Sequence, residues 1–195
     1  MNLYIDCDGV ILDTIKITYE NLIKKGLIDE NYKPYAGMES KIKLYYSTIN
    51  WEKLLTIANP INNSIEDIKK ISATGNFKHL SILTHINSVG EGIAKKRFFK
   101  EKLNEVPVSL VAKHISKSDV VNPKNSILVD DYAPNLIEFT KKGGIGILFD
   151  EDSQVFTEKT YTKDNIDYTF LTINSLIDLL AIDYKCMKPK IRTFR

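Results

Sequence analysis

Short runs of apolar residues alternate with longer amphipathic stretches along this chain of 195 residues. A run that is apolar throughout is typical of a strand covered on both faces, and alternation with helices favours a parallel sheet. The expected strands are residues 3–5, 80–83, 107–112, 126–129 and 145–149, with a last edge strand at 168–171. Helices are expected at 13–25, 89–103, 136–142 and 175–182. The pattern predicts an α/β fold, with a Rossmann-like parallel sheet flanked by helices.

Residues 27–76 break this alternation. They contain helical patterns at 39–48, 51–58 and 65–73 but no convincing buried strand, and Asn63 and Glu66 have the spacing of a capping box. The segment is too long for a simple connection in a compact domain. We therefore expect a small helical cap at 27–76, inserted into a catalytic core formed by residues 1–26 and 77–195.

Composition and charge exclude several classes of protein. The formal net charge of +2 gives no reason to expect a nucleic acid polymer or an anionic membrane as partner, and no run of about 18 apolar residues could span a bilayer. No signal peptide is evident, and Cys7 and Cys186 suggest neither a disulfide framework nor a zinc site. The tail after Asp183 carries five basic residues and is expected to be frayed and solvated. We expect a cytoplasmic protein, either a monomer or a homodimer.

The first expected strand leads directly into Asp6-Cys7-Asp8-Gly9. Side chains at i and i+2 project to the same side, so both carboxylates can face one site. Two adjacent anions repel each other unless a cation lies between them, and Mg²⁺ with its preference for oxygen ligands would relieve that repulsion. Gly9 would allow a sharp turn that brings backbone N–H groups near a phosphate. The alternative is a polar strand end that enters an ordinary turn.

Polar residues also follow the next two expected strands. Thr84 and the following backbone N–H groups, including that of His85, could hold phosphate oxygens, although Thr at a strand end is common. A lysine after the third strand could neutralise phosphate charge, because an ammonium group is a compact cation. Of Lys113, Lys117 and Lys124 we choose Lys117, with Lys113 second.

The fourth expected strand ends in Asp130-Asp131. Two acids at the end of a buried strand are costly unless they meet a metal or positive groups. Asn135 could orient them from the start of the next helix. The alternative is a helix N-terminus that merely favours acidic residues through its dipole. Because the carboxyl ends of parallel strands form the edge where ligands bind, we expect all four clusters to converge on one site.

The order of these clusters resembles the motif order of the haloacid dehalogenase (HAD) superfamily. The matching stretches are YIDCDGVILDT, SILTHI, KHISKSDVV and ILVDDYAPNL, and they cover the expected core from end to end. The resemblance implies that Asp6 attacks phosphorus to form an aspartyl-phosphate, and that Asp8 first protonates the leaving alkoxide and then activates water. It implies phosphate binding by Thr84 and Lys117. Mg²⁺ would be held by Asp6, the Asp8 carbonyl and Asp131, with Asp130 in support.

Within the superfamily the chain resembles the 5'(3')-deoxyribonucleotidase-like branch, through ILVDDYAPNLIEFTKKGGIGILF and the helical segment after the first motif. This implies a nucleoside or deoxynucleoside monophosphate as the substrate. Thr14 departs from the pattern, because that branch often has an aromatic residue there. Tyr45, Tyr46 and Trp51 are available to stack on a base, although aromatic residues in a small cap are more often part of its core.

Three other functions would use some or all of the same residue types. A phosphatase for another small phosphorylated metabolite would have the same motifs. A phosphorylatable signalling receiver also uses acids, Thr and Lys, but its phosphorylated Asp lies on the third strand, and here the double acid closes the fourth apolar run. An idle HAD-like binding protein would not need every catalytic residue type, and all of them are present. A magnesium-dependent phosphomonoesterase is the predicted function.

Overall fold

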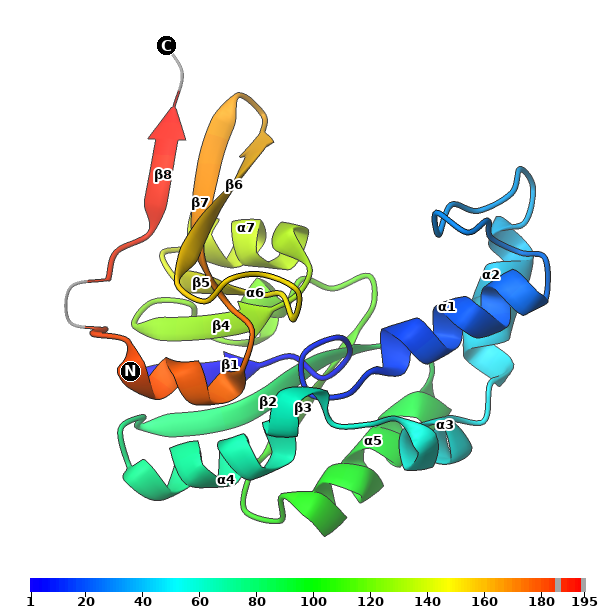
Figure 1. Ribbon diagram of the computed structural model, residues 1–195, viewed down its shortest axis with the longest axis horizontal. Coiled ribbons are helices and arrows are strands. Elements are labelled where there is room, and N and C mark those ends of the chain that lie inside the picture. Colours follow the sequence, from blue (N-terminus) through cyan, green and yellow to red (C-terminus); the bar gives the residue numbers. More distant parts are fainter. Residues whose placement is uncertain (185–186, 194–195) are drawn as a thin grey trace.

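The computed structural model describes residues 1–184 and 187–193. Its centre is one eight-stranded sheet in the order β3-β2-β1-β4-β5-β7-β6, with β8 also paired to β7 (Figure 1). The strands are β1 (Asn2–Ile5), β2 (His79–Ile86), β3 (Val108–Ala112), β4 (Ser126–Asp130), β5 (Ile145–Phe149), β6 (Thr157–Lys163), β7 (Ile166–Ile173) and β8 (Lys190–Thr193). The predicted α/β fold with a mainly parallel sheet is confirmed.

Strand β1 lies between β2 and β4, and all three run parallel. Ile5 is in register with Ile82 on one side and with Val129 on the other. The residues that follow these three positions therefore emerge at the same edge of the sheet, although they are far apart in the sequence. This register brings the chain after β1 beside the end of β4.

Helices cover both faces of the sheet because successive strand residues point to opposite sides. Leu3 and Ile5 belong to one buried cluster with α4 and α5, whereas Tyr4 belongs to another with α7. The helices are α1 (Thr14–Lys24), α2 (Glu39–Thr48), α3 (Trp51–Ile57), α4 (Ser64–Thr74), α5 (Val89–Lys102), α6 (Lys117–Val120) and α7 (Ala133–Lys141), with 3-10 turns at Ile61–Asn63 and Leu176–Ala181.

The segment at 27–76 contains α2, α3 and α4, as the sequence predicts, and no strand belonging to the sheet. Helix α2 buries no residue of its own and extends outward with α1 (Figure 1). By contrast, α3 packs against α5, and Ile65, Ile68 and Ile71 of α4 lie in the main core. The division into a separate cap and a core stays a prediction.

Several local predictions were wrong. Asn63 adopts a left-handed conformation with φ 63° and its side chain does not cap α4. Residues 168–171 belong to β7, which is not the edge, because β6 pairs with it on the far side. The tail after Asp183 is not wholly frayed, because Lys190–Thr193 form β8 against β7. Each of these differences depends on partners that are remote in sequence or on turn geometry.

Within residues 1–184 and 187–193, no helix is long and apolar enough to cross a membrane. Cys7 is a free, buried thiol. Cys186 lies outside the described residues.

Candidate active site

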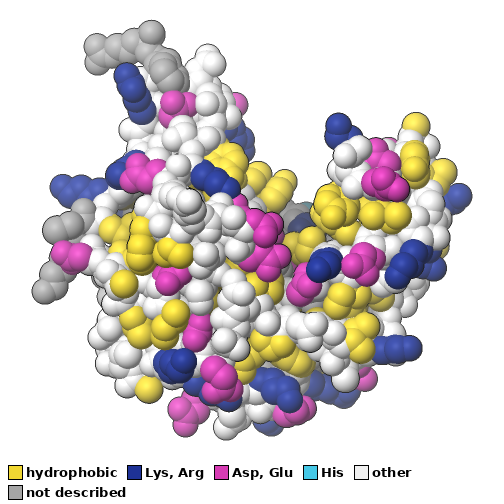
Figure 2. Space-filling model, in the orientation of Figure 1, with side chains coloured by type: hydrophobic (Ala, Val, Ile, Leu, Met, Phe, Trp, Pro, Cys, Tyr) yellow, Lys and Arg dark blue, Asp and Glu magenta, His cyan; other side chains and the backbone are white. Residues whose placement is uncertain are grey.

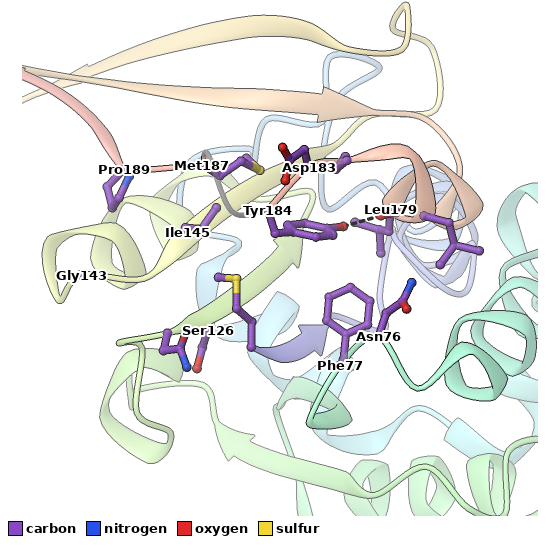
Figure 3. Close-up of a pocket in the computed structure, with 14 residues that line it drawn as sticks. Asn76, Phe77, Ser126, Gly143, Ile145, Leu179, Asp183, Tyr184, Met187 and Pro189 are labelled. Atoms are coloured by element: carbon purple, nitrogen blue, oxygen red, sulfur yellow. Dashed lines mark hydrogen bonds between the residues drawn. The ribbon is translucent and has the colours of Figure 1, made fainter.

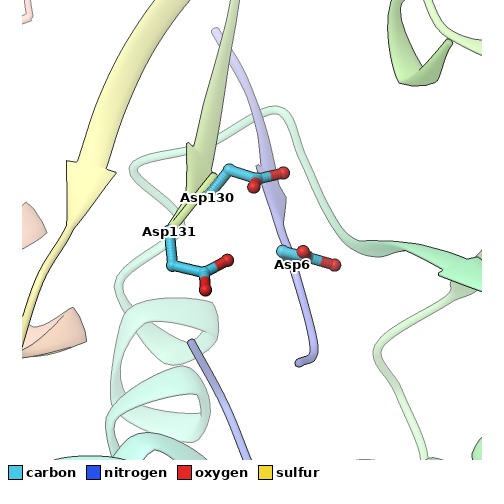
Figure 4. Close-up of side chains that lie close together, drawn as sticks. All are labelled: Asp6, Asp130 and Asp131. Carbon is cyan, nitrogen blue, oxygen red and sulfur yellow. The ribbon is translucent and has the colours of Figure 1, made fainter. Parts of the chain in front are cut away.

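Three carboxylates converge at the end of the sheet formed by β1 and β4. One oxygen atom from each of Asp6, Asp130 and Asp131 lies within 4.8 Å of the others (Figure 4). Asp6 follows Ile5, the last residue of β1, and its backbone N–H donates to the Val129 carbonyl at 2.9 Å. The two predicted acid clusters therefore meet in space, as the strand register requires.

A buried lysine lies between two of these acids. The Lys117 ammonium is 2.8 Å from Asp6 Oδ1 and donates to Asp130 Oδ2 at 2.7 Å, and only 1% of its side chain is exposed. Lys117 opens α6, where the Ser116 side chain caps the helix. Lys113 is exposed at the rim of the neighbouring cavity. Between the two lysines, the structure places Lys117 against the acids.

Asp130 and Asp131 have different surroundings. Asp130 is fully buried, accepts from Lys117 and from the Tyr132 backbone N–H at 2.9 Å, and accepts two bonds from Asn135 Nδ2 at 3.1 and 3.0 Å. No other residue in the described part of the chain donates a hydrogen bond to the Asp131 carboxylate. Asn135 thus orients Asp130, which leaves the Asp131 oxygens directed at the shared site.

Glycine is required at position 9, where the backbone approaches the Asp131 side chain closely. Its φ is +74°, a backbone conformation that residues other than glycine rarely adopt. A Cβ atom at this position would lie 2.3 Å from Asp131 Oδ2. The glycine therefore lets the turn after β1 approach the end of β4 closely.

The Asp8 carboxylate is held by Thr14 and by Lys95, and Lys95 lies outside the sequence motifs. Thr14 Oγ1 donates to Asp8 Oδ1 at 2.6 Å, and Lys95 Nζ lies 2.5 Å from Asp8 Oδ2. Lys95 comes from the middle of α5 and is completely buried, paired also with Glu91 at 2.7 Å. The only sequence signal for this pair is the i,i+4 spacing of Glu91 and Lys95, which is equally typical of a solvated helix face.

Thr84 and His85 lie in β2 beside the acids. The Thr84 hydroxyl is buried, 3.4 Å from Asp8 Oδ2, and accepts from Lys95 Nζ at 3.1 Å. His85 Nε2 lies 2.9 Å from the Ile115 carbonyl. Burial, together with the nearby Lys117 and Lys113 charges, lowers the pKa of His85, so the ring favours its neutral form. Phosphate binding by these two residues stays a prediction.

The three aromatic residues predicted for the substrate pocket differ in exposure. Trp51 is 5% exposed, its Nε1 donates to the Tyr46 carbonyl at 3.2 Å, and its ring lies 5.6 Å from Lys95 Nζ. Tyr45 and Tyr46 are half-buried and meet edge to face at 5.3 Å. Trp51 thus packs into the protein, whereas Tyr132, which the sequence did not single out, is 58% exposed beside Asp131.

A cavity of about 560 Å³ opens over the acids. Its wall includes Asp6, Asp8, Asp131 and Asn135 together with Tyr19, Tyr46, Trp51, His85, Lys113 and Tyr132. A second hollow of about 370 Å³ shares Ile15, Tyr19 and Asp131 with it and is bordered by Asp150, Glu151 and Asp152. Figure 2 shows the cleft between the α1/α2 arm and the β6–β7 hairpin, with acidic side chains along it.

A larger cavity of about 740 Å³ lies at the opposite end of the sheet (Figure 3). Its wall includes Ser126 and Ile145, which begin β4 and β5, and the Tyr184 hydroxyl beside it donates to the Leu179 carbonyl at 2.6 Å. It shares no residue with the carboxylate site. The candidate active site is therefore identified by the position of the acids and not by the size of the cavity.

The charges at the site are unbalanced in favour of acids. Two buried lysines, Lys95 and Lys117, face five carboxylates, those of Asp6, Asp8, Glu91, Asp130 and Asp131. Burial and the neighbouring Asp130 and Asp8 charges raise the pKa of Asp6, although Lys117 opposes this shift. Burial, Asp130 and Asp6 raise the pKa of Asp131 to about 8. For Asp8, the Lys95 ammonium outweighs burial and lowers the pKa.

This arrangement fits a divalent cation. Asp6 and Asp131 direct carboxylate oxygens at one point beside Asp130, and Mg²⁺ prefers oxygen ligands. A bound cation would also favour ionisation of Asp6 and Asp131, the two acids whose pKa values are raised by burial and by neighbouring like charges. The three carboxylates could therefore hold a metal ion, and their oxygen donors and excess negative charge are compatible with Mg²⁺.

The raised pKa of Asp131 predicts a stability that depends on pH. Between its ordinary value of 3.8 and about 8, the folded, metal-free protein holds a proton that the unfolded chain has lost. The free energy of unfolding should therefore decrease as pH rises through this window. Asp131→Asn should remove this part of the decrease and make the metal-free protein more stable at its upper end. Urea unfolding in EDTA over this pH range measures both effects.

Asp152→Asn is the matched control, because Asp152 is an exposed acid at the border of the neighbouring hollow. The control should keep the pH dependence of the unmodified protein. If the free energy of unfolding had the same slope against pH in Asp131→Asn and in the unmodified protein, the raised pKa of Asp131 would be contradicted.

Comparisons with known proteins concern the fold of the chain. No family model matches the amino-acid sequence, and no curated protein sequence matches it significantly. A HAD-superfamily hydrolase of subfamily IA, variant 1, from Geobacter sulfurreducens PCA is similar in structure, with a TM-score of 0.60, 12% identity, and 92% of this chain and 97% of that chain covered. CbbY from Rhodobacter sphaeroides in complex with phosphate has a TM-score of 0.51, 12% identity, and coverage of 91% and 95%.

A protein from Burkholderia xenovorans LB400 that is assigned as a haloacid dehalogenase-like hydrolase has a TM-score of 0.52 and 14% identity, with coverage of 94% of this chain and 96% of that chain. At these identities the similarity concerns the fold. Each of these three similarities covers more than nine tenths of this chain and of the other chain. The chain therefore has the fold of the HAD-superfamily hydrolases.

Proposed function

We propose that the protein is a magnesium-dependent phosphomonoesterase of the HAD superfamily. The observation that carries the proposal is the convergence of Asp6, Asp130 and Asp131 within 4.8 Å, with Lys117 buried between two of them. This cluster opens into a cavity that Asp8 also lines. It lies at the carboxyl edge of a parallel sheet, where such folds bind ligands.

The arrangement of Asp6 suits a nucleophile. Its Oδ1 atom accepts from the Cys7 backbone N–H at 2.7 Å and lies 2.8 Å from Lys117 Nζ. Both contacts fall on Oδ1, so Oδ2 remains for attack on phosphorus. In the first step the Asp6–phosphorus bond forms, the ester bond breaks, and the protonated form of Asp8 gives its proton to the leaving alkoxide. Covalent catalysis of this kind divides one difficult step into two.

In the second step Asp8 accepts a proton from water as the water oxygen bonds to phosphorus. The Asp6–phosphorus bond then breaks, which releases inorganic phosphate and restores the carboxylate. Lys117 and the Asp8 backbone N–H would bind the phosphoryl oxygens, where charge accumulates. The Cys7 and Gly9 N–H groups already donate to Asp6 Oδ1 and to the Leu12 carbonyl. Magnesium, held by Asp6, the Asp8 carbonyl and Asp131, would supply positive charge for the same oxygens.

The finer proposal is a nucleoside or deoxynucleoside monophosphate as the substrate, as in the 5'(3')-deoxyribonucleotidase-like branch. Tyr19, Tyr46 and Tyr132 line the cavity, and the exposed ring of Tyr132 follows Asp131 directly. Such a ring can stack on a base. The acids at 150–152 border the neighbouring hollow and would repel a second phosphate group. Both features favour a monophosphate with an aromatic group.

A screen of phosphomonoesters with and without Mg²⁺ tests this proposal. We expect turnover only with Mg²⁺, and higher kcat/KM for nucleoside monophosphates than for sugar phosphates or phosphoglycolate. Tyr132→Ala should raise KM for nucleotides by roughly 10-fold, since stacking on a base contributes about 1–3 kcal/mol. It should leave phosphoglycolate turnover unchanged. Phosphate release measures all of these rates.

Tyr35→Ala is the control, because Tyr35 is 51% exposed and does not line the cavity. Persistent turnover after rigorous chelation would refute the role of magnesium. A preference for sugar phosphates that Tyr132→Ala leaves intact would assign the site to another small phosphorylated metabolite.

A further inference from the structure

Lys95 is a fully buried cation in contact with the side chain of Asp8. Its ammonium nitrogen lies 2.5 Å from Asp8 Oδ2, 3.1 Å from Thr84 Oγ1 and 3.0 Å from the His85 carbonyl oxygen. Helix α5 approaches the sheet closely enough for this reach because Gly92 faces β3, where a Cβ atom would lie 2.8 Å from Leu110 Cδ1. The side chain therefore ends at the carboxyl edge of β2, directly behind Asp8.

Glu91 holds Lys95 in this place. One carboxylate oxygen lies 2.7 Å from Lys95 Nζ, and the other accepts from the backbone N–H of Asn87 at 2.7 Å and from its side chain at 3.1 Å. Glu91 is 1% exposed, and the Trp51 ring lies over the Lys95 ammonium. Glu91 and Trp51 thus contact the Lys95 ammonium group, and the side chain has little freedom to adopt another rotamer.

Stability alone does not explain this buried pair. Removing two charges from water costs several kcal/mol per ion, and well-packed apolar residues in place of such pairs are often as stable or more stable. Lys95 is also too far into the protein to meet substrate, because none of its side chain is exposed and it does not line the cavity. Its one contact with the reacting groups of the proposed mechanism is the Asp8 carboxylate.

We propose that Lys95, held in place by its ion pair with Glu91, is a positioning residue that fixes the orientation of Asp8 for proton transfer. The proposal rests on the proposed phosphatase function. Lys95 holds Asp8 Oδ2 and Thr14 holds Asp8 Oδ1, so the carboxylate has one orientation at the edge of the cavity. Without Lys95 the carboxylate rotates, and both the proton donation to the alkoxide and the activation of water become slower.

The test uses 4-nitrophenyl phosphate, whose leaving group departs without a proton. Lys95→Met and the double variant Glu91→Gln/Lys95→Met, which does not leave the Glu91 charge buried without a partner, are mixed rapidly with this substrate and Mg²⁺. We expect a burst of about one nitrophenolate per chain, followed by steady turnover that is slower by roughly 10- to 100-fold. Asp6 then accumulates as the aspartyl-phosphate, which intact-mass measurement detects. An alkyl phosphate, which needs the proton, should show the slow rate without a burst.

Lys96→Met is the matched control, because Lys96 is the next residue of α5 and is exposed. It should behave as the unmodified protein does. Unchanged steady turnover in the double variant would overturn the proposal. Burst amplitude and steady rate falling in equal proportion would also overturn it, because this marks a smaller folded fraction and a purely structural role. No turnover by the unmodified protein with any phosphate ester would instead refute the phosphatase function.

Discussion

Asp6→Asn should abolish turnover and leave the fold intact. The amide has the shape of the carboxylate, and its oxygen can still accept from the Cys7 N–H and Lys117, which lie at 2.7 and 2.8 Å from Oδ1. An amide is too weak a nucleophile to attack phosphorus, so no aspartyl-phosphate forms. Loss of a catalytic nucleophile reduces kcat by roughly 10³-fold or more. Phosphate release measures the loss, and urea unfolding checks the fold.

The control for this prediction is Asp164→Asn, at an exposed position in the turn between β6 and β7. Its activity should equal that of the unmodified protein. In EDTA, Asp6→Asn should be at least as stable as the unmodified protein, because it removes a buried charge that Asp130 and Asp8 oppose. Full turnover by Asp6→Asn would exclude this residue as the nucleophile and leave the three-carboxylate site without a catalytic assignment.

The sequence was sufficient to predict how the acids meet. Leu3 and Ile5 are apolar on both sides of Tyr4, and residues 126–129 have the same character, so both segments were recognisable as strands buried on two faces. Parallel strands place their carboxyl ends at one edge, which brings Asp6 near Asp130 and Asp131 without knowledge of the strand order. The sequence alone did not separate Lys117 from Lys113, because both follow the same strand.

The partner of Asp8 could not be predicted in the same way. Glu91 and Lys95 lie in GEGIAKKRFFK, where charged residues are frequent and resemble a solvated helix face. Whether a charged residue of this helix is exposed or buried depends on how α5 packs against β3 and α3. That packing depends on Gly92 and Trp51, whose roles become visible only when all three elements are assembled.

Strands β6 and β8 show a different reason for failure. Strand β6 has the sequence TEKTYTK, with side chains that are exposed or half-buried throughout, so no hydrophobic run marks it. Its signal is the turn at Asp164 and Asn165, both with positive φ, which suits a two-residue hairpin. Strand β8 is exposed along its length and is defined by pairing with β7. Pairing of this kind leaves little trace in composition.

Lys117→Met should both destabilise the metal-free protein and stop catalysis. The variant keeps the length of the side chain but leaves Asp6 and Asp130 without the cation that lies 2.8 and 2.7 Å from them. Removing one partner of a buried ion pair costs about 3–5 kcal/mol, because the remaining charges stay buried without compensation. Urea unfolding in EDTA measures this loss. Added Mg²⁺ should restore part of the stability, since it supplies positive charge to the same carboxylates.

Turnover with saturating Mg²⁺ then separates Lys117 and Lys113, the first and second choices from the sequence. Lys117→Met should stay inactive after Mg²⁺ has restored its stability, because the metal does not replace the ammonium group that faces both the nucleophile and the phosphoryl oxygens. Lys113 is exposed at the rim of the cavity. The free energy of unfolding of Lys113→Met should therefore lie within about 0.5 kcal/mol of that of the unmodified protein. Its kcat should be preserved, with at most a rise in KM. A greater loss of kcat in Lys113→Met than in Lys117→Met would transfer the phosphate-binding role to Lys113 and leave Lys117 as a structural counter-charge for Asp6 and Asp130.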